Sequence, residues 1–216
     1  MLDKLFNILA IPFNWLSRWD LIGRIIGGLF FTYWIYYRFG YLHSYSMPLL
    51  WYLENTQFLL FIIAYITRLK AVDRAVGFWQ TIYPLGTAML PFALSPYSFK
   101  PAPVTQPQLQ SLCVLLLIIG LSIQIVGVFY LRRSFSIMTE ARELVTKGIY
   151  RFMRHPMYIG SFFGALGIGL YRFSFFNMFI FLTFVLCQSY RASREELKLI
   201  KNFPAYNQYR KRVWWF

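Results

Sequence analysis

Long apolar stretches separated by short polar segments run through most of the 216-residue chain. A helix that crosses a membrane needs about 20 mostly apolar residues. Six stretches approach that length, and we expect spanning helices over residues 21–38, 48–67, 76–94, 109–131, 157–171 and 174–191. Only Arg172 and Phe173 separate the last two, and the fifth is short for a full span. These two are therefore predicted to form a hairpin with arms of unequal length.

The composition supports a membrane protein. The chain is 58% hydrophobic, 21% aromatic and only 14% charged, whereas soluble domains are about 25% charged. It carries 22 Lys and Arg against 8 Asp and Glu, for a formal net charge of +14. Such a balance can indicate nucleic-acid binding, but the apolar stretches between the basic runs favour a membrane. The predicted fold class is an all-α, polytopic membrane protein whose partners include membrane lipids and no nucleic acid.

The basic residues predict the orientation of the chain. Loops on the cytoplasmic side of a membrane carry an excess of Lys and Arg. With six spans, 19 of the 22 basic residues fall on the side of the two termini, and only Arg38, Lys100 and Arg172 flank the other side. Both termini are therefore predicted to be cytoplasmic.

The chain is predicted to divide into an N-terminal membrane region, 1–131, and a C-terminal region, 132–216, which holds a cytoplasmic loop, the hairpin and a C-terminal helix. The first 20 residues mix acids with bases and lack a small-residue cleavage site, so they make a poor signal peptide. We expect an interfacial helix there, with Trp15 and Trp19 at headgroup depth. The chain's two cysteines lie far apart inside apolar runs, and we expect no metal site.

One cluster of polar residues lies at the start of the fifth span, in YRFMRHPMYIG at 150–160. Gly148 predicts a turn before it, and Pro156 is suited to the first turn of a helix. His155 would then lie at the helix N-cap, where free backbone N–H groups favour anionic ligands. Two simpler interpretations stay open: Arg151 and Arg154 follow the positive-inside rule, and His155 is an interfacial histidine bonded to a carbonyl.

A second cluster follows the sixth span. Arg191 and Glu195 stand four residues apart and would share one face of a helix. The alternative is a solvated helix with ion pairs that contribute little. Further along, Tyr206 and Tyr209 are expected to pack their helix against the membrane face.

Glu54 is an acid within the second predicted span. An ionisable residue at such a position is a functional candidate by default, and a transporter or scaffold that uses Glu54 is one non-enzymatic alternative. The neighbouring Asn55 and Gln57 favour a structural hydrogen-bond network instead.

Four motifs in order carry a family resemblance: RSFSI, LVTKGIYRFMRHPMYIG, R-x-x-x-E-E-L and F-x-x-Y-x-x-Y-x-x-x-V, across residues 131–213. They resemble the integral-membrane methyltransferases, in particular the isoprenylcysteine carboxyl methyltransferase family and its short prokaryotic relatives. The resemblance implies that the loop before the hairpin and the acidic helix after it enclose S-adenosylmethionine. It also implies a multi-pass protein of a prokaryotic inner membrane.

Carried over to this sequence, the resemblance assigns Arg191 as the catalytic residue that holds the acidic group of a lipophilic or lipidated acceptor. The implied cofactor-binding residues are Arg142, Glu143, Leu144, Val145, Tyr150, His155, Pro156, Met157, Tyr158 and Glu195.

The expected reaction is O-methylation of the acceptor carboxylate. A carboxylate is already ionised at neutral pH, because its ordinary pKa is about 4, and it needs no general base. Two other reactions stay open: N-methylation of a phospholipid, and NADPH-dependent reduction by a membrane reductase of the sterol type, which carries a similar H-P-x-Y-x-G pattern.

Overall fold

A computed structural model describes residues 20–40, 48–94 and 105–214. The expected interfacial helix with Trp15 and Trp19 lies outside these residues. Within them the regular structure is helical, and the extended segments pair only in two isolated bridges, Asp73 with Ala141 and Met153 with Trp214. The all-α fold class predicted from the sequence is confirmed.

Four of the six predicted apolar stretches, 21–38, 48–67, 109–131 and 157–171, coincide closely with described helices. Their bounds are α3 Asp20–Phe39, α4 Pro48–Thr67, η2 Phe78–Gln80, α5 Ile82–Ala93, α6 Pro107–Leu131, η3 Arg132–Ser134, η4 Gly148–Arg151, α7 Pro156–Tyr171, α8 Phe175–Asn202 and α9 Tyr206–Arg212. Three stretches of the described chain are long and apolar enough to cross a membrane: Pro48–Thr67, Pro107–Ser134 and Phe175–Asn202. The protein thus has the helices of a membrane protein, while the number of spans stays a prediction.

The third predicted span differs most from expectation. Where a helix over 76–94 is expected, the chain forms the short η2 and then the 12-residue α5. Gly77 has a φ of 78°, outside the helical region, so the chain turns there before the helix begins. A 12-residue helix rises about 18 Å, which is well short of the hydrocarbon core of about 30 Å.

The sixth predicted span is longer than expected. Helix α8 continues from the apolar stretch through the acidic cluster to Asn202 without a break. Its Arg, Glu, Leu and Lys residues are good helix formers. Pro204 disfavours the helical conformation at Phe203, which is extended and ends the helix. The sixth predicted span and the acidic cluster after it therefore belong to one continuous helix.

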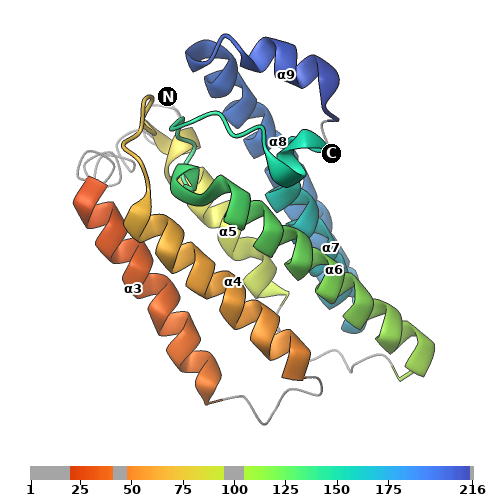
Figure 1. The fold of residues 1–216 in the computed structure, drawn as a ribbon. Helices are drawn as coiled ribbons and strands as arrows, with labels where there is room; N and C mark the ends of the chain where they lie inside the picture. Colours follow the sequence, from red (N-terminus) through yellow and green to blue (C-terminus); the bar gives the residue numbers. More distant parts are fainter. Residues whose placement is uncertain (1–19, 41–47, 95–104, 215–216) are drawn as a thin grey trace, which may run out of the picture.

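The helices pack as a bundle in which α3 contacts α4, α4 contacts α6, α6 contacts α7, and α8 contacts both α7 and α5. Figure 1 shows that the connection 68–81, the loop 132–155 and α9 lie at one end of the bundle, with the α7–α8 turn at the other. The residues with candidate chemistry therefore gather at a single end.

Glycines bring α6 and α7 into close contact. A Cβ at Gly120 of α6 would lie 2.6 Å from the carbonyl oxygen of Gly160 in α7, and one at Gly167 would lie 2.8 Å from the oxygen of Cys113. Small residues at such contacts let membrane helices approach closely. The position of α7 is therefore set by α6.

Three polar residues of α4 form contacts inside the bundle. Glu54 forms an ion pair with Arg38, Asn55 donates to the Trp51 carbonyl at 2.7 Å, and Gln57 donates to Gln124 of α6 at 2.6 Å. The structural interpretation of the Glu54 region is thus supported by its contacts. Large apolar side chains on the outer faces of α3, α4, α6 and α8 stay exposed, as expected for helices that face lipid.

Candidate functional site

The loop between α6 and α7 is anchored by the connection between α4 and α5. Ala141 pairs with Asp73 in an antiparallel bridge, with N···O distances of 2.9 and 3.2 Å. Thr139 donates its backbone N–H to Gln80 at 3.0 Å, and Leu69 donates to Arg133 at 2.8 Å. An element from the N-terminal half thus fixes the loop of the C-terminal half.

Asp73 also ties this connection to α8. Its carboxylate accepts hydrogen bonds from Lys198 at 3.1 Å and from Asn202 at 3.0 Å. Burial alone would raise the pKa of Asp73, but the hydrogen bonds from Asn202 and Lys198 and the Lys198 charge outweigh it and lower the pKa from its ordinary 3.8. Asp73 is therefore ionised, and it links the connection between α4 and α5 to α8.

The start of α7 matches the turn chemistry of its sequence. Gly148 has a φ of 60°, a left-handed conformation that glycine adopts without steric cost. Pro156 occupies the first turn, and His155 is the N-cap residue, whose carbonyl accepts from Tyr158 and Ile159 at 3.0 and 3.1 Å. Both sequence predictions for this corner are confirmed.

A hydrogen-bonded group joins α7 to α8. The Tyr158 hydroxyl donates to Glu195 Oε1 at 2.5 Å, and Arg191 Nε donates to the same oxygen at 3.2 Å. Arg191 Nη2 donates to the Ile137 carbonyl at 2.6 Å, and the guanidinium lies 5.3 Å from the centre of the Tyr158 ring. We refer to Tyr158, Arg191 and Glu195 as the partition, because this hydrogen-bonded group contains one wall residue of each of the two cavities described next.

The first cavity, here termed the polar cleft, has a volume of about 110 Å³. It is bounded by the loop 132–155, by α9 and by the C-terminal end of α8. Its walls are Leu131, Ser134, Ser136, Met138, Glu140, Arg142, Glu143, Leu144, Val145, Tyr150, Arg154, Glu195, Leu199, Tyr206 and Tyr209. It thus mixes carboxylates, guanidinium groups, hydroxyls and apolar side chains.

Two polar features of the polar cleft stand out. Glu140 and Arg142 form a buried ion pair at 2.6 Å, and Ser136 donates to Glu140 at 2.8 Å. The Ser134 hydroxyl is buried and has no hydrogen-bond partner among the described residues. Burial raises the pKa of the Tyr150 phenol above its ordinary value.

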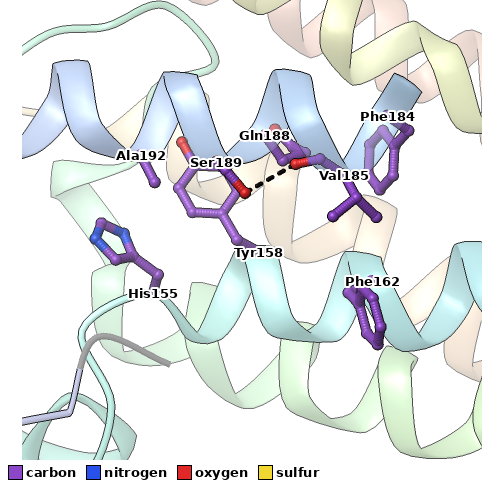
Figure 2. Close-up of a pocket in the computed structure, with 8 residues that line it drawn as sticks. All are labelled: His155, Tyr158, Phe162, Phe184, Val185, Gln188, Ser189 and Ala192. Carbon is purple, nitrogen blue, oxygen red and sulfur yellow. Dashed lines mark hydrogen bonds between the residues drawn. The ribbon is translucent and has the colours of Figure 1, made fainter. Parts of the chain in front are cut away.

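The second cavity, here termed the apolar pocket, lies between α7 and α8 and has a volume of about 40 Å³. Figure 2 shows side chains from the two helices around it. They are His155, Tyr158, Phe162, Phe184, Val185, Gln188, Ser189 and Ala192. Tyr158 lines this pocket and bonds to Glu195 of the polar cleft, so the two cavities are neighbours across the partition.

A second link runs parallel to the partition. Glu196 Oε1 accepts from His155 Nε2 at 2.9 Å and from Arg154 Nη1 at 2.8 Å. His155 lines the apolar pocket and Arg154 the polar cleft. Both cavities are therefore tied to α8 at two consecutive residues, Glu195 and Glu196.

The structure distributes the predicted site residues between these cavities. Six of the ten implied cofactor-binding residues line the polar cleft: Arg142, Glu143, Leu144, Val145, Tyr150 and Glu195. His155 and Tyr158 line the apolar pocket. Pro156 is buried in the first turn of α7, and the Met157 side chain packs toward Gly127 of α6. Pro156, Met157 and Arg191 line neither cavity, and Arg191 is bonded to Glu195 of the polar cleft.

The sequence analysis missed several residues of the site. Ser134 and Ser136 belong to the quoted RSFSI motif, and Glu196 is the second acid of the E-E pair, so the motifs contained a signal for them. Gln188 is a polar residue within an apolar run. The same pattern makes Glu54 a candidate in the sequence.

Tyr206 and Tyr209 correct an expectation. They line the polar cleft rather than a membrane-facing surface. Tyr206 is 1% exposed, and the Tyr209 hydroxyl donates to the Tyr150 carbonyl at 2.6 Å. Helix α9 therefore turns back over the loop, because Pro204 ends α8 just before it.

Comparison with known proteins finds similarity in the part of the chain that forms the two cavities. Residues 109–205 match the phospholipid methyltransferase family. The resemblance to integral-membrane methyltransferases is confirmed over this region. The matched residues include the whole partition and all walls of the two cavities except Tyr206 and Tyr209.

Two individual proteins are similar to part of the chain. The protein-S-isoprenylcysteine O-methyltransferase of Schizosaccharomyces pombe is 42% identical over 73 residues, which are 32% of this chain and 30% of that protein. The nickel-cobalt-cadmium resistance protein NccN of Alcaligenes xylosoxydans xylosoxydans is 33% identical over 75 residues, 34% of this chain and 35% of that protein. The chain thus matches about a third of the length of each relative.

Proposed function

We propose that this protein transfers a methyl group from S-adenosylmethionine to the carboxylate of a lipophilic acceptor in the membrane. The observation that carries the proposal is the partition. The partition is a common wall of two cavities. One is the polar cleft at the end of the bundle, and the other is the apolar pocket between α7 and α8. A water-soluble donor and a lipid-like acceptor would meet at such a wall. The similarity to an isoprenylcysteine O-methyltransferase over 73 residues supports the same reaction.

The groups of the polar cleft fit the parts of S-adenosylmethionine. The ammonium group of S-adenosylmethionine would lie beside the carboxylates of Glu143 and Glu195. Its carboxylate would find Arg142 and the unpartnered hydroxyl of Ser134. The apolar walls, Leu144 and Leu199 among them, suit the flat purine ring. When bound, S-adenosylmethionine supplies an electrophilic methyl group on a positively charged sulfur.

Arg191 is the proposed anchor of the acceptor. Its side chain is 8% exposed, and a guanidinium so placed keeps its charge. Nε and Nη2 already bond to Glu195 and Ile137, and only Nη1 stands outside these two contacts. The acceptor carboxylate would therefore meet Nη1, while Tyr158 and Glu195 hold the guanidinium in place. Positioning of two reactants can supply about 7–11 kcal/mol of the barrier.

The apolar pocket would take the part of the acceptor next to its carboxylate. Phe162, Phe184 and Val185 offer only apolar contacts, and the rest of a long acceptor could extend into the lipid between α7 and α8. A prokaryotic inner membrane with both termini in the cytoplasm stays our prediction for the location. Prenylated or other isoprenoid acids are the proposed acceptors.

Methylation of a phospholipid amine is the second candidate, because the family that residues 109–205 match carries the description phospholipid methyltransferase. The permanent charge of Arg191 at the partition favours an anionic acceptor over an ammonium group. The two reactions leave chemically different products, since a methyl ester is cleaved by mild base and an N-methyl group is not.

The test begins with calorimetry on the purified full-length chain. We expect saturable binding of S-adenosylmethionine and of its demethylated product, and no binding of NADPH. Labelled methyl transfer into a total lipid extract would then yield a base-labile label. Absence of binding by both methyl-donor species would refute the methyltransferase proposal, NADPH binding would favour the reductase, and a base-stable label would favour N-methylation.

A further inference from the structure

Tyr65 is a buried tyrosine in the last turn of α4. The residue is 7% exposed. Gly27 of α3 makes room for its ring, since a Cβ at that position would overlap the ring atoms. The ring of Phe31, also in α3, lies 5.9 Å away, centre to centre. The Tyr65 ring is therefore held between two helices that lie side by side (Figure 1).

The hydroxyl of Tyr65 reaches the loop between α6 and α7. It accepts a hydrogen bond from the backbone N–H of Ile137 at 3.4 Å. Next to it, the Phe135 ring stacks on Phe61 of α4 at 4.8 Å and lies 5.6 Å from the centre of the Tyr65 ring. Phe135 and Ile137 both belong to the RSFSI motif. Helix α4 thus holds this part of the motif by a hydrogen bond and by aromatic contacts.

The carbonyl of the same residue, Ile137, holds Arg191. It accepts from Arg191 Nη2 at 2.6 Å, while Nε donates to Glu195 at 3.2 Å. A guanidinium group is planar, so two bonded nitrogens fix the direction of the third, Nη1. This is the nitrogen proposed to meet the acceptor carboxylate. A displacement of Ile137 would therefore turn Nη1 away from the acceptor.

The ring and the hydroxyl of Tyr65 serve different contacts. The ring packs against α3 and Phe135, and the Arg68 guanidinium lies over it at 5.1 Å. Phenylalanine would keep the shape of this ring. Among the described residues, the hydroxyl adds one hydrogen bond, the one from Ile137. Removal of the hydroxyl alone therefore separates a role in packing from a role in positioning Ile137.

We infer that Tyr65 is a positioning residue for Arg191 that acts through the backbone of Ile137. The inference rests on the proposed function and extends it to the N-terminal half of the chain. Tyr65 lines neither cavity, and it lies outside the residues 109–205 that match the methyltransferase family. Its hydroxyl holds Ile137, and Ile137 in turn directs Arg191 at the acceptor carboxylate.

The test is Tyr65→Phe in the full-length chain, with S-adenosylmethionine as donor and an S-farnesyl thioether acid as acceptor. The kcat/KM for the acid should fall about two- to tenfold, the loss expected for one hydrogen bond. The affinity for S-adenosylmethionine, measured by calorimetry, should stay unchanged. A packing role predicts instead a lower thermal midpoint with equal losses for donor and acceptor. That result, or an unchanged kcat/KM, would overturn the inference.

Tyr52→Phe is the matched control, because it makes the same change in the same helix at a residue that is 60% exposed. It should alter neither kcat/KM nor donor affinity. In an Arg191→Lys background, which lacks the planar guanidinium, Tyr65→Phe should cause no further loss. Full additivity of the two substitutions would contradict a common path through Ile137.

Two measurements without methyl transfer separate this inference from the proposed function. In Tyr65→Phe, amide hydrogen exchange at Ile137 should become faster. The NMR signal of Arg191 Nε–H, assigned by its loss in Arg191→Lys, should shift, and Tyr52→Phe should change neither quantity. If the unaltered protein transfers no methyl group, the proposed function fails. A shifted Arg191 signal would still support the positioning role, whereas an unchanged signal would refute it.

Discussion

The polar cleft and the apolar pocket share a wall but are built in different ways. The polar cleft is bounded mainly by an irregular loop, which hydrogen bonds from the 68–80 connection and from α8 hold in place. The apolar pocket is bounded by two regular helices, one of which is packed through glycines against α6. The polar cleft, the proposed donor site, therefore depends on polar anchors, and the apolar pocket, the proposed acceptor site, depends on helix packing. Variants should therefore affect the two sides separately.

The largest effects are expected in the partition. Glu195→Ala should weaken S-adenosylmethionine binding by about 10- to 100-fold, because hydrogen bonds to charged groups contribute about 1.5–3 kcal/mol. Arg191→Ala should leave that affinity nearly unchanged and reduce turnover by at least a similar factor. Calorimetry with the donor and labelled-methyl assays measure the two quantities. Equal loss of donor affinity in both variants would contradict the division of roles across the partition.

A medium effect is expected at the contact of α6 with α7. A Cβ at Gly160 would lie 2.6 Å from the Gly120 oxygen and 2.5 Å from Gln124, and overpacking typically costs about 1–3 kcal/mol. Gly160→Ala should lower the thermal midpoint and raise KM for the acceptor more than KM for the donor, because α7 forms a wall of the apolar pocket.

Gly169→Ala is the control for this variant, since a Cβ there would meet nothing within 4 Å. It should keep or raise the thermal midpoint. Equal effects of the two substitutions would mean that glycine entropy, rather than close packing, explains the result.

The smallest effect is expected at Asp73, whose side chain is 21% exposed, because partly exposed ion pairs contribute about 0.2–1 kcal/mol. Asp73→Asn should weaken donor binding a few-fold and increase amide hydrogen exchange at 139–142, with little change in acceptor KM. Lys201→Ala, which removes a largely exposed partner at 3.5 Å, is the matched control. A change confined to acceptor KM would oppose our comparison of the two sides.

The lowered pKa of Asp73 adds a pH dependence with a defined sign. The stability that its carboxylate contributes is fully present above its ordinary pKa of 3.8 and is lost as the pH falls through the lowered value. Unfolding measured across acidic pH should show this component in the unaltered protein and not in Asp73→Asn.

The sequence predicts the helices well because membrane spans need only length and apolar composition. It also predicts the N-cap at His155, the turn at Gly148 and the Arg191–Glu195 pair, since these depend on neighbours within a few residues. The short α5 was not predicted, because hydropathy alone does not show where the chain turns at Gly77.

Long-range contacts account for what the sequence analysis missed in the site. Asp73 meets Lys198 across 125 residues, and no local pattern indicates this pair. The family motifs placed Glu195 near the loop, but they do not show that Met157 turns toward α6 while Tyr158 turns toward α8. That difference follows from the close packing at Gly127 and Gly160.

The unbroken course of α8 sets a distance as well as a shape. Phe184 in the apolar pocket and Glu195 at the polar cleft are eleven residues apart, about three turns and about 16 Å. They therefore share one face, with Gln188 and Arg191 between them. A single residue inserted between Ala192 and Glu195 would turn the α8 walls of the two cavities about 100° out of register while leaving every side chain present. Because α8 is unbroken, the distance between the two cavities is fixed, and a substrate that reaches from one to the other must fit that distance.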